Sequence, residues 1–155
     1  MDGNAYLLGL GKIVSNLQSL EVCLRVFLCD ANGQTFKFPK PGDNSLPDSY
    51  LTNYDSLGKL VGDYNAMLDV GDKVFEVDSQ VVHIRDALAH GRLMSPGELF
   101  PLTLFRFDRP ANGSAGIRFI VELTEAWFEK NRKLIHEQMM KVVECSKKRN
   151  YPSIG

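Results

Sequence analysis

The sequence predicts a mainly α-helical fold of four helices, with a β-hairpin inserted between the third and the fourth. Three observations support this. In four separate segments, apolar residues recur at steps of three and four, which is the period of a helix. After Gly91 the apolar period changes to two, as in strands, in two runs that end near Phe107 and at Leu123 and are separated by a loop at residues 109–116. The length of 155 residues suits one domain, so we expect residues 1–155 to form a single helical domain.

The composition excludes several classes of protein. Hydrophobic residues make up 44% of the chain and charged residues 24%, which is ordinary for a globular domain in water. No apolar run approaches the roughly 18 residues that span a bilayer, and residues 5–10 are too short for a signal peptide. The three cysteines lack metal-ligand spacing and suit free thiols better than a disulfide framework. We therefore expect a cytoplasmic protein that does not bind a membrane.

Residues 4–29 are predicted to form the first helix, with Asn4 as its N-cap. Gly9 and Gly11 each cost about 1 kcal/mol relative to Ala inside a helix, unless they let a neighbouring helix approach closely. The segment from Asp30 to Gly33 ends this helix. Its apolar positions follow helical spacing and are Leu7, Leu10, Val14, Leu17, Leu24 and Leu28.

A long connection follows, because residues 34–50 contain three prolines and Gly42, which excludes a regular helix. Within it, residues 35–38 are expected to be extended, with Phe36 and Phe38 covering the edge of the core. Loops of this length are often functional.

Two further helices are predicted before Gly91. The second covers residues 52–68. The third begins after Gly71, is capped by Asp72, and should pack antiparallel to the second. The apolar face of the second is Leu57, Leu60, Val61, Tyr64 and Met67, and that of the third is Val74, Val77, Val81, Ile84 and Leu88.

The hairpin is expected at about residues 100–123, with Asn112-Gly113 in its loop. A lone hairpin is marginal in water, so its apolar side must pack on the helices. The fourth helix is predicted over residues 126–148, with Thr124 as its N-cap. The apolar side of the second strand is Ile117, Phe119, Val121 and Leu123, and that of the fourth helix is Trp127, Phe128, Leu134, Ile135, Met139, Val142 and Val143.

The candidate chemistry lies at the end of the third helix, where Arg85, Asp86 and His90 precede Gly91. Gly91 is typical of a helix end because glycine enters the left-handed conformation without steric cost. Cleaving RNA without a metal needs a base for the 2′-hydroxyl and a cation for the phosphate. Imidazole exchanges protons near neutral pH and suits the first task, and the guanidinium fork suits the second. Asp86 could orient either side chain. The alternative is that these residues only pair with neighbouring helices and cap the helix end.

Arg85-Asp86-Ala87-Leu88-Ala89-His90 resembles the Arg-polar-x3-His signature of the HEPN superfamily (higher eukaryote and prokaryote nucleotide-binding domains). The resemblance implies a helical bundle that dimerises so that two motifs share one cleft. It also implies a metal-independent endoribonuclease without a cofactor, acting as a toxin or antiviral effector and, as a toxin, paired with a separate antitoxin protein. Other members of the superfamily are inactive RNA-binding or scaffold modules, so that alternative stays open. The hairpin departs from a plain four-helix bundle.

Charge and the remaining candidates complete the prediction. Residues 1–84 hold six basic and eleven acidic side chains, whereas residues 85–155 hold twelve basic and eight acidic ones. An RNA ligand would therefore use the second part of the chain, and Arg92, Lys130 and Lys133 are the candidate phosphate-binding residues. A wider basic rim would add Arg106, Arg109, Arg118 and Arg132, although ordinary solvated faces are an equally good reading. His83 lies near the face of His90, but two histidines without a third ligand make a poor metal site.

Overall fold

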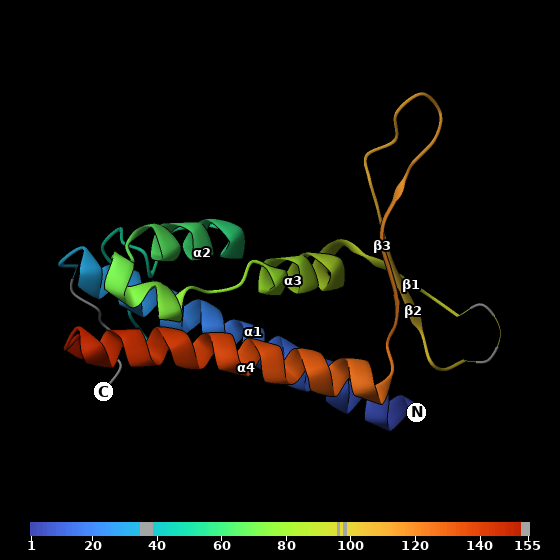
Figure 1. Cartoon of the computed structure of the whole chain (residues 1–155), viewed down its shortest axis with the longest axis horizontal. Coiled ribbons are helices and arrows are strands. Elements are labelled where there is room, and N and C mark those ends of the chain that lie inside the picture. Colours follow the sequence, from blue (N-terminus) through green and yellow to red (C-terminus); the bar gives the residue numbers. More distant parts are fainter. Residues whose placement is uncertain (35–38, 96, 98, 153–155) are drawn as a thin grey trace. The chain divides into compact units, whose positions relative to one another are not determined.

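The computed structural model describes residues 1–34, 39–95, 97 and 99–152, and the expected extended piece at residues 35–38 lies outside these. The described residues form a mainly helical protein with a small antiparallel sheet (Figure 1). The elements are helices α1 (Gly3–Ala31), α2 (Leu57–Ala66), the short 3-10 helix η1 (Val70–Phe75) and α3 (Gln80–His90), strands β1 (Arg92–Met94), β2 (Thr103–Phe107) and β3 (Ile117–Glu122), and helix α4 (Glu125–Lys148).

The chain forms two compact units. The first comprises Met1–Leu17 and Gln80–Ile135, and the second comprises Gln18–Ser79 and His136–Gly155. Helices α1 and α4 each contribute residues to both units.

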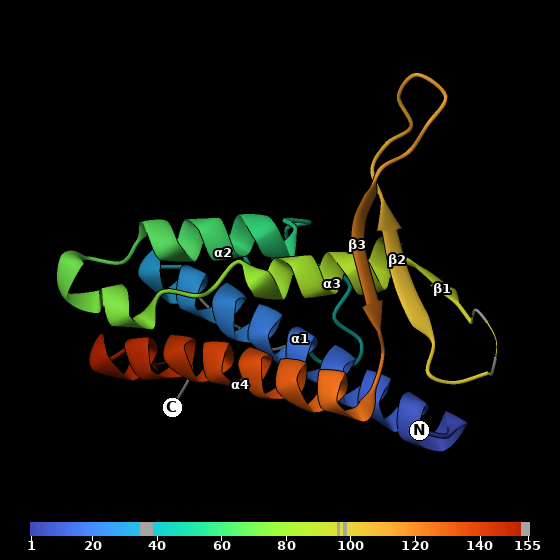
Figure 2. The ribbon, with the colours of Figure 1, turned by 45° about the vertical axis from the view of Figure 1, so that its right-hand side comes forward.

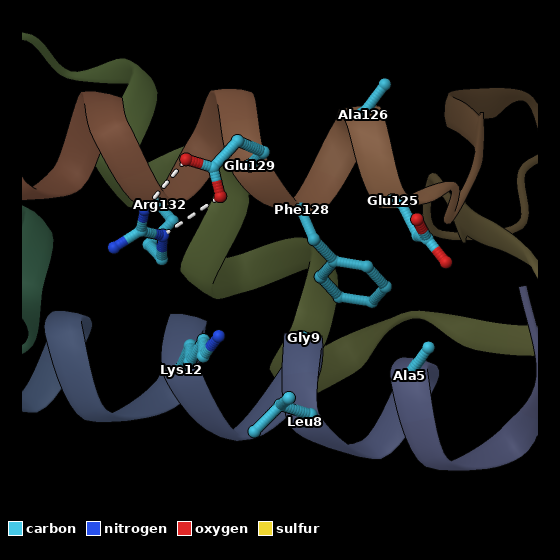
Figure 3. A pocket seen from close by; sticks show the side chains of 9 residues that line it. All are labelled: Ala5, Leu8, Gly9, Lys12, Glu125, Ala126, Phe128, Glu129 and Arg132. Carbon is cyan, nitrogen blue, oxygen red and sulfur yellow. Dashed lines mark hydrogen bonds and ion pairs between the residues drawn. The ribbon is translucent and has the colours of Figure 1, made fainter.

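In the first unit, the N-terminal part of α1 packs against the N-terminal part of α4. The contact centres on Phe128, whose ring lies over Gly9 (Figure 3). The ring also meets Tyr6 edge-on, with 5.8 Å between the centroids. A Cβ atom at Gly9 would lie 2.7 Å from the ring, whereas one at Gly11 would meet nothing within 4 Å. The predicted close approach of a second helix is therefore confirmed for Gly9 only.

The sheet of the first unit has the strand order β1-β2-β3, with both pairs antiparallel. The predicted hairpin is confirmed as β2 and β3, but β1 was not predicted because three residues are too few to show a period. Helix α3 leads directly into β1, and the sheet stands across the C-terminal end of α3 (Figures 1 and 2). Leu104 of β2 is 1% exposed, so the hairpin does bury an apolar side.

The predicted buried side of β3 is wrong at its first residue. A bulge between Arg106 and Phe107 lets Phe107 pair with Ile117 while Arg106 pairs with Phe119. The extra residue turns Ile117 to the other face, where it is 58% exposed.

The second unit has its core around Phe27 of α1. The ring lies 4.7 Å from that of Tyr64 on α2 and 5.2 Å from that of Tyr151, measured between centroids.

The predicted cap of the first helix and the predicted start of the second differ from the structure. Asp2, rather than Asn4, caps α1 by accepting a hydrogen bond from the Ala5 N–H (2.8 Å). Helix α2 begins at Leu57, capped by Ser56.

The late start of α2 has a physical cause in Arg25. This side chain is 9% exposed, and its guanidinium donates to the backbone oxygens of Tyr50 (2.6 Å), Asn53 (3.3 Å) and Asp55 (2.9 Å). Carbonyls bound in this way are not available to the first turns of a helix. The segment before Ser56 therefore stays irregular.

The third helix is also shorter than predicted. The Val77 N–H donates to Asn65 Oδ1, the Val77 oxygen accepts from Asn65 Nδ2 (both 2.9 Å), and the Asp78 N–H donates to Gln138. Side chains thus take up the backbone groups that a continuous helix would use. Val74 is 73% exposed and does not extend the buried face of α3.

Asp72 does not cap the third helix, because it is buried in η1. It accepts hydrogen bonds from Lys148 (2.6 Å) and Arg149 (2.8 Å) at the end of α4. These two bonds, with Lys148 contributing more, hold the pKa of the Asp72 carboxyl below its usual value. The basic end of α4 therefore binds a specific carboxylate of its own unit.

Candidate functional site

Helix α3 positions the three predicted catalytic residues on the sides that it does not bury. Its buried residues are Val81, Ile84 and Ala87. Arg85 and Asp86 are partly exposed, with side-chain exposures of 30% and 26%, and His90 is exposed. Leu88, predicted to be buried, is only partly so. The helix continues through His90. Arg85 and His90 consequently leave the axis about 140° apart.

Asp86 forms ion pairs with two arginines, one on its own helix and one on the sheet. One oxygen lies 3.0 Å from a guanidinium nitrogen of Arg85, and the other lies 3.5 Å from a nitrogen of Arg106 on β2. His90 follows Asp86 by four residues, so the two are neighbours one turn apart on the same helix face. We call Arg85, Asp86, His90 and Arg106 the α3 cluster. All four belong to the first unit.

Sequence analysis named Arg106 only as one residue of a wider basic rim. Its position between Phe105 and Phe107 in the strand could have singled it out. In a strand, alternate side chains point to opposite faces. Arg106 therefore shares the face of buried Leu104, where an arginine needs a partner, and Asp86 is that partner.

Gly91 fixes the end of α3 for a reason other than the one predicted. The φ angle of Gly91 is not positive, so this residue does not adopt the left-handed conformation. Its N–H continues the helical pattern by donating to Ala87 O (2.7 Å). A Cβ atom there would clash with that same oxygen and lie 2.5 Å from Leu104 Cδ1 and 3.0 Å from the oxygen of Phe105. Glycine is required because the helix end and β2 approach so closely.

The predicted phosphate-binding residues lie on two different elements. Arg92 is in β1, two residues after His90, with its guanidinium carbon 5.6 Å from the centroid of the Phe107 ring. Lys130 and Lys133 are exposed on α4. The two ion pairs of Asp86 join it to Arg85 and Arg106.

A hollow of about 550 Å³ lies elsewhere in the first unit, between the N-terminal parts of α1 and α4 (Figure 3). Lys12, Glu125, Glu129 and Arg132 supply its charges, and apolar side chains supply the rest. Arg132 and Glu129 bind each other at 2.7 Å, and this pairing lowers the pKa of the Glu129 carboxyl. No residue of the α3 cluster lines the hollow.

Metal and thiol chemistry find little support in the described residues. Within residues 1–34, 39–95, 97 and 99–152, no three His, Cys, Asp or Glu side chains come together as metal ligands. Burial raises the pKa of the thiols of Cys23, Cys29 and Cys145, the opposite of what a reactive thiolate needs. None of the helices in the described part of the chain has the length and apolar character to cross a bilayer.

Comparison with known proteins adds no assignment. No protein-family model, no curated protein and no solved structure matches this chain. What the chain does must therefore be argued from the α3 cluster itself.

Proposed function

We propose that the protein is a metal-independent endoribonuclease whose active site is the α3 cluster. The observation that supports the proposal most is Asp86, which holds the guanidiniums of Arg85 and Arg106 at a partly exposed position one helical turn from His90. An anchored guanidinium offers its remaining N–H groups to phosphate oxygens in a fixed orientation.

The reaction uses the 2′-hydroxyl of the RNA as the nucleophile. His90 takes its proton, the 2′-oxygen bonds to phosphorus, and the bond from phosphorus to the 5′-oxygen breaks. The leaving oxygen takes a proton from water or from the imidazole of a second chain. Arg85 and Arg106 neutralise the charge that builds up on the five-coordinate phosphate. The products carry a 2′,3′-cyclic phosphate and a 5′-hydroxyl, and DNA is not cleaved.

A homodimer belongs to this proposal. Because Arg85 and His90 leave α3 about 140° apart, one chain presents them in different directions. A two-fold axis beside the end of α3 would bring Arg85 of one chain towards His90 of the other and double the positive charge at the phosphate. The spacing resembles that of HEPN ribonucleases, so we further propose a cytoplasmic toxin or antiviral effector with a separate antitoxin as its partner.

The same ion pairs favour a second candidate function. Asp86 joins α3 to β2 through Arg106, so the cluster also stabilises the contact between helix and sheet. In that case the protein is a non-catalytic scaffold of HEPN type that binds RNA or protein, and the motif only holds the end of α3 in place.

The test is an in vitro cleavage assay on mixed RNA in the presence of a metal chelator. Arg85→Lys should lose most activity, because an ammonium keeps the charge but not the planar fork. His90→Ala should lose about 10²–10⁴-fold, as is typical for a general acid or base. The matched control is His83→Ala, which removes an exposed histidine from the same helix and should retain full activity.

Thermal unfolding of each variant separates the two candidates. Under the nuclease proposal, the Arg85 and His90 variants unfold near the wild-type temperature and lose cleavage. Absence of cleavage by the wild type, together with early unfolding of both variants, would establish the scaffold function instead. Sedimentation that gives a fully active monomer would remove the dimer from the proposal.

A further inference from the structure

The exposed face of the sheet has an unusual composition. Across the three strands, Arg92 pairs with Phe105 and Phe105 with Ile120, while Phe107 pairs with Ile117. Residues that pair directly share a face of the sheet, and Phe105 and Phe107 share one because they are two residues apart. We call these five residues the aromatic face.

The aromatic face points away from α3. Leu104 and Arg106 alternate with the two phenylalanines along β2, and it is they that meet α3, at Gly91 and at Asp86. The side chains of Phe105 and Phe107 must therefore point to the opposite side. Figure 2 shows the strands of this sheet with α3 ending against them.

The face is partly exposed, and its two aromatic rings are nearly parallel. Ile117 and Ile120 are 58% and 59% exposed, and the two phenylalanines are partly exposed. The rings of Phe105 and Phe107 are nearly parallel, with an interplanar angle of 6° and 6.3 Å between centroids. The guanidinium of Arg92 lies over Phe107 and adds a cation to the apolar surface. Exposed apolar patches on protein surfaces are uncommon, and they are often binding sites.

Charge and size identify the occupant. Arg92 is the arginine shown on this face, since Arg106 lies on the opposite face with Asp86, and the acidic residue on this face, Glu122, pairs with Thr103 at the end of the strands farther from Phe107. A stable protein dimer needs about 800 Å² and 20–30 residues from each partner, more than five side chains provide. Sheets that bind single-stranded nucleic acid need only two or three aromatic side chains on which bases stack, with arginines for the phosphates.

We propose that the aromatic face binds single-stranded nucleic acid, with bases stacking on Phe105 and Phe107 and a phosphate bound by Arg92. This goes beyond the proposed nuclease function, since it assigns binding rather than cleavage and does not depend on the α3 cluster. Stacking uses the planes of the bases, so RNA and DNA bind similarly. Affinity falls with salt, by about 0.7 in log K per log salt for each phosphate contacted.

The test measures the anisotropy of two fluorescent 15-mers, oligo-dT and 2′-O-methyl oligo-U, neither of which has the free 2′-hydroxyl that cleavage would require. We expect micromolar binding of both by the wild type. Phe105→Leu and Phe107→Leu keep an apolar side chain in the strand but remove the ring, and each should weaken binding about 10-fold. Arg92→Ala should reduce the salt slope by about 0.7.

Tyr54→Ala is the matched control, because Tyr54 is a fully exposed aromatic residue outside the sheet. It should bind as the wild type does, and the unfolding temperature of every variant is measured alongside. Wild-type affinity in both leucine variants, or no binding by the wild type at 100 µM concentrations (about a hundred times the expected Kd), overturns the proposal. So does a change of oligomeric state in the leucine variants with binding unchanged, which would make the face an interface between copies. Binding of these probes, together with no cleavage of an unmodified oligo-U of the same length, would count against the nuclease alone.

Discussion

The contact between α1 and α4 in the first unit makes a sharp prediction at Gly9. Replacing Gly9 with Ala places a Cβ atom 2.7 Å from both Cγ and Cδ2 of Phe128. Cγ is the ring atom nearest the backbone, so a small side-chain rotation does not relieve the clash. Phe128 is 5% exposed and its ring meets those of Tyr6 and Trp127 edge-on. The two helices must therefore move apart.

The magnitude follows from two opposing effects. Gly→Ala in a helix interior stabilises by about 1 kcal/mol, and overpacking costs about 1–3 kcal/mol. Gly9→Ala should thus range from neutral to about 2 kcal/mol destabilising. Gly11→Ala is the matched control, two residues further along the same helix, where a Cβ atom meets nothing within 4 Å. It should stabilise by about 1 kcal/mol.

Thermal and urea unfolding of the two variants measure the difference directly. For a chain of this length, 1 kcal/mol corresponds to about 2–4 °C in Tm. We expect Gly11→Ala to have a higher Tm than the wild type. The free energy of unfolding of Gly9→Ala should be about 1–3 kcal/mol lower than that of Gly11→Ala. Equal stabilisation by both substitutions would refute the close packing of α1 on Phe128.

Two further predictions concern stability. Hydrogen bonds from Lys148 and Arg149 lower the pKa of Asp72 in the folded state; this stabilisation is present above the unfolded pKa of about 4 and is lost as pH falls through the lower folded value. Asp72→Asn should therefore flatten the acid side of the pH–stability profile, and a wild-type slope in that variant would contradict the assignment. Leu88→Ala, at a partly exposed site, should cost about 1–2 kcal/mol, against about 2–5 for buried Ile84→Ala; equal losses in urea unfolding would show that Leu88 is buried.

Much of the secondary structure could be predicted because, in a long segment, the spacing of the apolar residues indicates whether it forms a helix or a strand. The first and last helices were predicted as residues 4–29 and 126–148, and are Gly3–Ala31 and Glu125–Lys148. Thr124 caps α4 as predicted, accepting a hydrogen bond from the Trp127 N–H (3.1 Å). The hairpin was predicted because a period of two persisted over both strands. In each case, local sequence and burial favour the same element.

The errors arise where distant side chains take over backbone groups. Nothing near residue 52 signals that Arg25 will bind the carbonyls of Tyr50, Asn53 and Asp55. Likewise, Asn65 binds both backbone groups of Val77 from twelve residues away and so separates η1 from α3. Asp72 follows Gly71 and so has the sequence position expected of an N-cap, but in the structure it is a buried carboxylate. Such pairings depend on the folded chain, and a reading of local periods cannot find them.

The candidate site, too, could be predicted only where it depends on local sequence. The motif residues and their position at the end of the third helix could be predicted. The ion pair between Asp86 and Arg106 could not, because it joins residues twenty positions apart across a helix and a strand. The reason that glycine occupies position 91 was also hidden, since it depends on how closely β2 approaches.

The two proposed activities meet at one edge of the sheet. Strand β2 presents Arg106 to the α3 cluster on one face and the rings of Phe105 and Phe107 on the other, so a bound nucleic acid cannot reach both faces through the sheet. It must pass around an edge. The strand order β1-β2-β3 makes β1 an edge strand, and β1 begins with Arg92, two residues after His90. A single strand that stacks on the aromatic face and crosses β1 at Arg92 would arrive beside His90. Loss of the guanidinium of Arg92 should then weaken binding and cleavage together, whereas loss of His90 should slow cleavage about 10²–10⁴-fold and leave the binding of uncleavable strands intact.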